Sequence, residues 1–140
     1  MISKSTLLGT LFGFLVLYLL GWAFYCHLAS EFYESHSNVS MNNMLPVFIA
    51  LGSLLFCFGL ANLYRKNNHG GNPGPKSGFF LGAWVGFCIG FGLNILNYGS
   101  TQMMDFTGTL VDSIWCVFFY GLNGAAIGWA FKLTTPKKES

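Results

Sequence analysis

Charged residues are scarce in this sequence, since Asp, Glu, Lys and Arg together make up only 9% of its 140 residues. Soluble domains carry about 25% charged residues, which keep their surfaces hydrated. The scarcity therefore excludes an ordinary soluble globule. The net charge of +2 at pH 7 is also too small and too spread out to indicate a nucleic-acid partner.

Cysteine is sparse too, with four copies that are far apart and form no Cys-x-x-Cys pair. This spacing excludes a disulfide-dense secreted scaffold, and the thiols are expected to behave as small apolar side chains. The sequence also lacks His-Glu-x-x-His, Gly-x-Ser-x-Gly and any pair of carboxylates on one apolar segment. We therefore predict that the protein is not an enzyme, and we predict no cofactor and no metal site.

Apolar residues, by contrast, make up 53% of the chain and gather into four long blocks. A helix needs about 20 apolar residues to cross a hydrocarbon core of roughly 30 Å. A block that is apolar on every side must be helical in lipid, because lipid offers no partner to backbone N–H and C=O groups. The sequence predicts a single all-α transmembrane domain over residues 1–140, an integral membrane four-helix bundle with spans at about 6–28, 44–64, 78–98 and 110–131.

The cations indicate how this bundle is oriented. All seven Lys and Arg residues lie before the first span, between the second and third, or after the fourth. The loops on the other side carry Glu31, Glu34 and Asp105 but no Lys or Arg. The positive-inside rule then predicts two antiparallel hairpins with the N and C termini in the cytoplasm. Residues 65–77 are rich in Gly, Pro and Asn and are predicted to be a mobile cytoplasmic loop.

Glycines recur along one face of the third span and along part of the fourth. Residues four apart share a helix face, and small residues allow helix backbones to approach closely in lipid. The predicted helix-packing residues are Gly78, Gly82, Gly86, Gly90, Gly121, Gly124 and Gly128. A contact between protomers and a gating hinge are alternative interpretations of the same rows.

Several polar residues are predicted to come together toward the outer leaflet. Intramembrane ionisable residues are costly and often mark functional sites. The possible polar pocket consists of His27, Asn94, Asn97, Asp112 and Asn123. A structural interpretation competes, because Thr109-x-x-Asp112 resembles a capping box with Asp in place of Glu. A proton relay is a third alternative.

The fourth span carries a second face opposite its glycines, formed by Asp112, Cys116, Phe119 and Asn123. Both faces can be buried only if this span is central or if the protein assembles further. Otherwise Asn123 would meet lipid. We take this pattern as an indication of a homo-oligomer or a larger membrane complex.

The segment after the first span allows a metal-site hypothesis. His27, Glu31 and Glu34 lie at positions i, i+4 and i+7, and His36 follows. On one helix face the first three could hold a divalent cation. Because the spacing matches no standard metal motif, a solvated helix end is the favoured interpretation.

Four short segments carry a resemblance to known proteins: Leu20-Gly21-Trp22, the run from Gly92 to Gly99, Leu110-Val111-Asp112 and Ile127-Gly128-Trp129. They are similar to segments of a loose group of small four-span bacterial membrane proteins that carry a domain of unknown function. The resemblance covers most of the chain and implies the bacterial inner membrane. In that group an acid is expected about where Asn94 stands, so the resemblance does not carry a proton or cation role to this chain.

These observations favour a structural or accessory protein, or an interaction subunit, that is embedded in a lipid bilayer. The alternative is an oligomeric channel or transporter for a small solute or ion, with a path along Asn94, Asn97, Asp112 and Asn123. A third hypothesis is an outward sensor that uses His27, Glu31 and His36.

Overall fold

The structure, a computed structural model, describes residues 3–39, 45–68 and 71–135. Four helical runs are long and apolar enough to cross a membrane by length and composition: Lys4–Leu28, Pro46–Asn67, Pro75–Thr101 and Phe106–Thr134. The prediction of an all-α chain with four long apolar helices is confirmed. Met44, where the second span was predicted to begin, lies outside the described residues, as do Lys137 and Lys138.

Two of the four runs contain a π-helical turn, which the sequence patterns did not predict. The elements in chain order are α1 (Lys4–Ala23), η1 (Phe24–Leu28), α2 (Ser30–His36), α3 (Pro46–Asn67), α4 (Pro75–Phe87), η3 (Cys88–Leu93), α5 (Asn94–Thr101) and α6 (Phe106–Thr134). The two π-helical turns are η1 and η3. Such turns often occur at functional sites.

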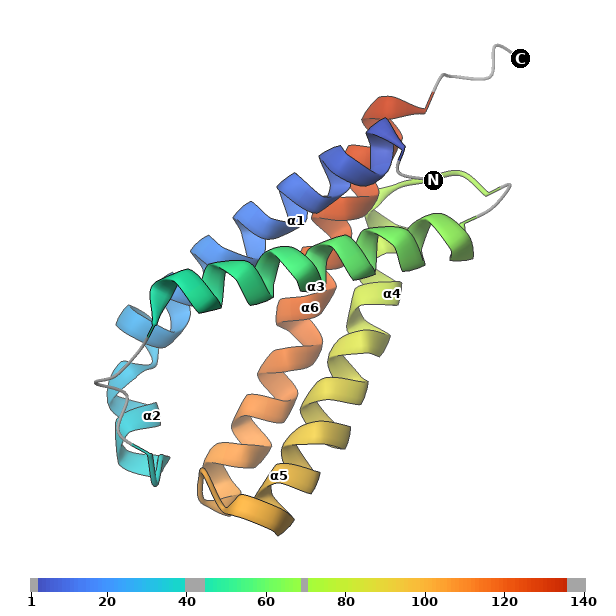
Figure 1. The fold of residues 1–140 in the computed structure, drawn as a ribbon. Helices are drawn as coiled ribbons and strands as arrows, with labels where there is room; N and C mark the ends of the chain where they lie inside the picture. Colours follow the sequence, from blue (N-terminus) through green and yellow to red (C-terminus); the bar gives the residue numbers. More distant parts are fainter. Residues whose placement is uncertain (1–2, 40–44, 69–70, 136–140) are drawn as a thin grey trace.

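The tightest packing in the molecule is between α4 and α6, which lie side by side in Figure 1. A Cβ atom would fall closer than 3.0 Å to the α6 backbone at each of Gly78, Gly82, Gly86 and Gly90. The nearest α6 residue moves back from Gly124 to Ser113 as the chain advances along α4, so the two helices run in opposite directions. Dispersion contact of this kind holds helices together in lipid.

The α6 glycines take part in the same contact from the other side. A Cβ atom at Gly124 would meet the carbonyl oxygen of Gly78, and one at Gly128 would meet that of Gly74. Gly121 lies instead against the Phe79 ring, where a Cβ atom would come within 2.8 Å of Cε2. These glycines are thus occupied by packing within one chain.

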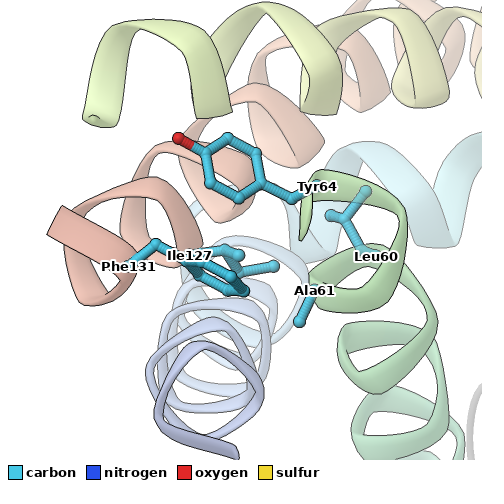
Figure 2. Packing of buried hydrophobic residues seen from close by; sticks show 5 residues of the cluster. All are labelled: Leu60, Ala61, Tyr64, Ile127 and Phe131. Carbon is cyan, nitrogen blue, oxygen red and sulfur yellow. The ribbon is translucent and has the colours of Figure 1, made fainter. Parts of the chain in front are cut away.

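The helix α6 lies at the centre of the bundle, in contact with α1, α3 and α4. Figure 2 shows the larger apolar cluster, formed by Leu60, Ala61, Tyr64, Ile127 and Phe131. A second cluster contains Leu17, Cys57 and Phe119. The apolar core therefore joins α3 to α6 mainly through the second half of α3.

Asn123 lies inside this core and is fully buried. Its Nδ2 donates a hydrogen bond to the Gly13 carbonyl oxygen at 2.7 Å and lies 3.5 Å from the Cys57 sulfur. Because α6 is central, both of its faces are buried within one chain. Asn123 therefore gives no support to further assembly.

The loop predicted over 65–77 is shorter than expected, and that prediction was wrong at both boundaries. Arg65 lies in the last turn of α3, and Ser77 lies in the first turn of α4. The Tyr64 hydroxyl accepts a hydrogen bond from the Gly74 N–H at 2.9 Å and lies 2.8 Å from Ser77 Oγ, which ties the two helix ends together. Residues 69–70 of the predicted loop lie outside the described residues.

The start of α1 and the end of α6 meet at one end of the bundle, where Thr134 Oγ1 donates a hydrogen bond to Ser5 Oγ at 2.7 Å. The α3–α4 connection lies at the same end (Figure 1). The described cations all belong to helix turns at this end: Lys4, Arg65, Lys66, Lys76 and Lys132.

Replacing Gly86 with Leu should destabilise the folded protein by about 3 kcal/mol or more, because the new side chain overlaps the α6 backbone. Gly92→Leu is the matched control, since a Cβ atom at Gly92 meets nothing within 4 Å. The control should change stability by less than about 0.5 kcal/mol. Denaturation in mixed detergent micelles, followed by circular dichroism, measures both. Equal effects of the two variants would contradict the packing argument.

Candidate functional site

The polar centre of the structure is the carboxylate of Asp112, near the start of α6. Its Oδ1 accepts hydrogen bonds from the Tyr25 hydroxyl at 2.9 Å and from the Tyr33 hydroxyl at 2.8 Å. Its Oδ2 accepts one from Asn94 Nδ2 at 2.7 Å, and the Cys116 sulfur lies 3.7 Å from the same oxygen. Side-chain donors from η1, α2 and α5 therefore bond to one carboxylate. We call Asp112, Tyr25, Tyr33 and Asn94 the Asp112 centre.

The two π-helical turns position the donors that come from the long helices. Tyr25 lies within η1, and Asn94 follows η3 directly. A π-helical turn holds more residues than an α-helical turn, so the side chains that follow it are rotated relative to an unbroken helix. Ser113 Oγ donates a hydrogen bond to the Gly90 carbonyl oxygen at 2.7 Å, which fixes η3 against α6.

Neutral donors, and not a cation, stabilise this carboxylate. The described Lys and Arg residues belong to the opposite end of the bundle. A charge taken out of water is costly unless its lone pairs are hydrogen-bonded. Burial, together with the adjacent Asp112 carboxylate, raises the pKa of Tyr33 well above its ordinary value. Tyr33, which lies outside the four spans, therefore remains a protonated donor.

Aromatic rings cover the carboxylate on the side of the bundle core. The Trp115 ring stacks on the Phe24 ring with their centroids 3.7 Å apart, and the centroids of Tyr25 and Tyr33 are 4.9 Å apart. Trp115 Nε1 is buried and has no hydrogen-bond partner within the described part of the chain. Asp112 is half-buried, and apolar rings beside its donors lower the local dielectric, which strengthens the hydrogen bonds that it accepts.

The short helix α2 is held over the carboxylate by bonds to the α5–α6 connection. The Asn38 N–H donates to the Met103 carbonyl oxygen at 2.8 Å, and the Asp105 N–H donates to the His36 carbonyl oxygen at 2.9 Å. In addition, His36 Nε2 lies 3.9 Å from Asp105 Oδ2. These bonds keep the Tyr33 hydroxyl within reach of the carboxylate.

Asp112 is not a helix cap, so the capping-box interpretation was wrong. The N-cap of α6 is Asp105, whose Oδ1 accepts a hydrogen bond from the Gly108 N–H at 2.7 Å. Thr109 Oγ1 bonds to the Asp105 carbonyl oxygen at 2.8 Å. Asp112 lies two turns further into the helix, where its side chain reaches other segments.

A partly open cavity of about 280 Å³ lies beside the Asp112 centre. Its walls include Val39, Asn94, Asn97, Tyr98, Met103 and Met104. Asn94 belongs both to the cavity and to the Asp112 centre, because its amide nitrogen is bound to the carboxylate. The cavity and the carboxylate are therefore connected through one side chain.

Of the residues predicted to form a polar pocket, the structure brings together Asn94 and Asp112, with Asn97 in the adjoining cavity. His27 is exposed, and its ring lies against Trp22 with the centroids 4.5 Å apart. Asn123 lies eleven residues beyond Asp112 on α6, about 16 Å away at 1.5 Å per residue.

The sequence analysis missed Tyr25 and Tyr33. Both are hydroxyl donors near the C-terminal end of the first predicted span, and this location was the only local signal available. Their acceptor lies 87 and 79 residues away in the chain. No local pattern records a contact over such a separation.

The metal-site hypothesis finds no support in this geometry. Within residues 3–39, 45–68 and 71–135, no three His, Cys, Asp or Glu side chains come close enough to hold one ion. His36 instead stacks on the Phe32 ring, with the ring centroids 4.2 Å apart.

By length and composition, the four apolar helices fit a membrane-embedded protein, and a hydrogen-bonded carboxylate near one end of the bundle is its most prominent polar feature. Comparison with protein-family models, with curated proteins and with solved structures finds no match. The resemblance to four-span bacterial membrane proteins stays a prediction.

Replacing Tyr33 with Phe should lower the free energy of unfolding by about 1.5–3 kcal/mol, because a hydrogen bond to a charged group is lost. Asn97→Leu is a suitable control, since no described residue bonds the Asn97 side chain, and it should have little effect. Unfolding in mixed micelles measures both changes. A double-mutant cycle with Asp112→Asn would show additive effects if Tyr33 and Asp112 did not interact.

Proposed function

We propose that the protein is an accessory or interaction subunit of the bacterial inner membrane. In this role it binds another transmembrane helix along the exposed face of α3, which covers the first half of the helix, before Phe56, and continues to Gly59. The observation that carries the proposal is that no residue in the first half of α3 is buried, and that the exposed face continues to Gly59. Support comes from the exposure of its side chains and from the surroundings of its glycines.

All buried residues of α3 lie in its second half, namely Cys57, Leu60, Ala61 and Tyr64. In the first half, the exposed fraction is 77% for Val47, 68% for Phe48 and 62% for Leu55. Lipid can cover such residues, so exposure alone does not require a partner. The two exposed glycines of α3 give a more specific argument.

Gly52 and Gly59 are seven residues apart and so share one face of α3, where an added Cβ atom at either would meet nothing within 4 Å. Glycine within a helix costs roughly 0.5–1 kcal/mol relative to alanine. Elsewhere in this chain, a glycine in a helix allows two helix backbones to touch, as Gly82 does against α6, and this contact offsets the cost of the glycine. The open pair on α3 is suited to the same contact with a helix of another chain.

The proposal includes an orientation in the membrane. The described Lys and Arg residues gather at the end where α1 starts and α6 finishes, whereas Glu31, Glu34 and Asp105 belong to the opposite end. The positive-inside rule then supports two antiparallel hairpins with both chain ends in the cytoplasm. The Asp112 centre and its cavity would face the outer surface.

A channel or transporter for a small solute or ion is the second candidate. The Asp112 centre and the cavity beside it favour this role, because both could receive a solute from the outer side. Against it, the α4 and α6 backbones touch and Asn123 is sealed in the core. Conduction would therefore require the helices to separate or a second chain to complete a path.

The accessory role is tested by placing a photoreactive residue at Leu55 on α3, with the equally exposed Trp84 on α4 as the control position. Illumination of native membranes should give one discrete protein adduct from position 55 and none from position 84. Adding Gly59→Leu should abolish the adduct without unfolding the chain, because the space at Gly59 is open. An adduct of two 15.4 kDa chains would identify a second copy as the partner. Adducts with lipid alone would contradict the role.

Ion flux separates the two candidates. Purified protein in liposomes is expected to leave the permeability to H⁺, Na⁺ and K⁺ at the level of protein-free vesicles, because the inner half of the bundle is packed. Flux above that level, lost in Asp112→Ala while the variant stays folded, would favour the transporter instead.

A further inference from the structure

The cavity beside the Asp112 centre presents hydrogen-bond acceptors that no described residue uses. A carboxylate can only accept, so Asn94 must direct Nδ2 at Asp112, and its Oδ1 is left over. No described residue donates to that oxygen, and none bonds the side-chain amide of Asn97 or the hydroxyl of Tyr98. A ligand with N–H groups would satisfy these oxygens.

The charges around the cavity favour a cation. Asp112 is hydrogen-bonded to Asn94, which lines the cavity. Asp105, the N-cap residue of α6, lies at the same end of the bundle. Glu31 and Glu34 lie on α2 nearby, and the described Lys and Arg residues belong to the other end of the bundle. Opposite charges attract more strongly beside a low-dielectric membrane than in bulk water. Apart from histidine, the charged side chains of α2 and of the first two turns of α6 are acidic, which disfavours an anion.

The remaining walls are apolar and limit the size of the ligand. Met103 and Met104 are adaptable thioether side chains, and the Tyr98 ring can contact either an alkyl group or a cation. The volume of about 280 Å³ lies just below the range of roughly 300–1,000 Å³ that is typical of ligand pockets. This space fits a small molecule.

The geometry points to a binding site for a small organic monocation, namely a primary ammonium that carries a short alkyl chain. The ammonium N–H groups bond to Asn94 Oδ1 and to the Asn97 amide oxygen, with the Asp112 charge behind them. The alkyl chain lies against the two methionines. This site goes beyond the accessory role and uses none of the α3 surface.

Methionine methyl groups report directly on the cavity. Protein labelled with ¹³C at its methionine methyl groups is placed in lipid nanodiscs, and the signals of Met103 and Met104 are assigned with Met→Leu variants. Butylammonium should shift both signals in a saturable manner. Butanol, the neutral control of similar size, should bind at least tenfold more weakly, and butyrate should cause no saturable shift. Higher salt should weaken the binding of butylammonium more than that of butanol.

Variants then locate the site. Asn97→Leu should weaken butylammonium binding about tenfold, because a hydrogen bond to a charged group is lost. Asn62→Leu is the matched control on α3, where the Asn62 side chain bonds only the Phe58 carbonyl oxygen of its own helix, and it should leave binding unchanged.

Three results would overturn the inference: equal binding of butanol and butylammonium, no saturable shift with butylammonium, or equal losses in the two asparagine variants. None of these results bears on the crosslinking test at α3. Conversely, lipid-only adducts at α3 would contradict the accessory role but would not bear on the ammonium site. The two proposals can therefore fail separately.

Discussion

The close approach of α4 and α6 is the contact on which the rest of the structure depends. Because Gly78, Gly82 and Gly86 have no side chains, the two backbones touch along most of α4. Hiding one apolar helix against another gains little in lipid, so dispersion contact between closely fitting surfaces must hold the helices together. The contact uses one face of α6 and leaves the rest of its surface for α1 and α3, which makes α6 the central helix.

The same contact sets the geometry of the Asp112 centre. It brings η3 beside α6, where Ser113 Oγ binds the Gly90 carbonyl oxygen and Asn94 comes within reach of the carboxylate. The carboxylate then binds the hydroxyls of Tyr25 and Tyr33. The bundle is thus joined by glycine contacts along the α4–α6 pair, by apolar packing of α3 toward the cationic end and by hydrogen bonds to one carboxylate at the other end. Since a half-buried carboxylate is costly without its donors, each donor matters for stability.

The two proposed roles use surfaces that do not overlap. The exposed face of α3 offers apolar side chains and the open glycines Gly52 and Gly59, which suit a helix in lipid. The cavity offers unused acceptors near acidic residues, which suit a small cation from water. Asn94 belongs to both the cavity and the Asp112 centre, so a bound ligand would contact a residue that also bonds to the Asp112 carboxylate.

The sequence by itself determined the four helices, their order and the separation of cations from acids, because bilayer thickness and backbone hydrogen bonding act on each segment alone. Four-residue spacing also identified the glycine face of the third span that lies against α6. Of the Asp112 centre, only Asn94 and Asp112 could be named in advance. The tertiary structure decided the rest, since Tyr25 and Tyr33 reach the carboxylate through a π-helical turn and a short helix folded back over α6. Contacts between such distant segments depend on how the whole chain packs, and local composition does not record them.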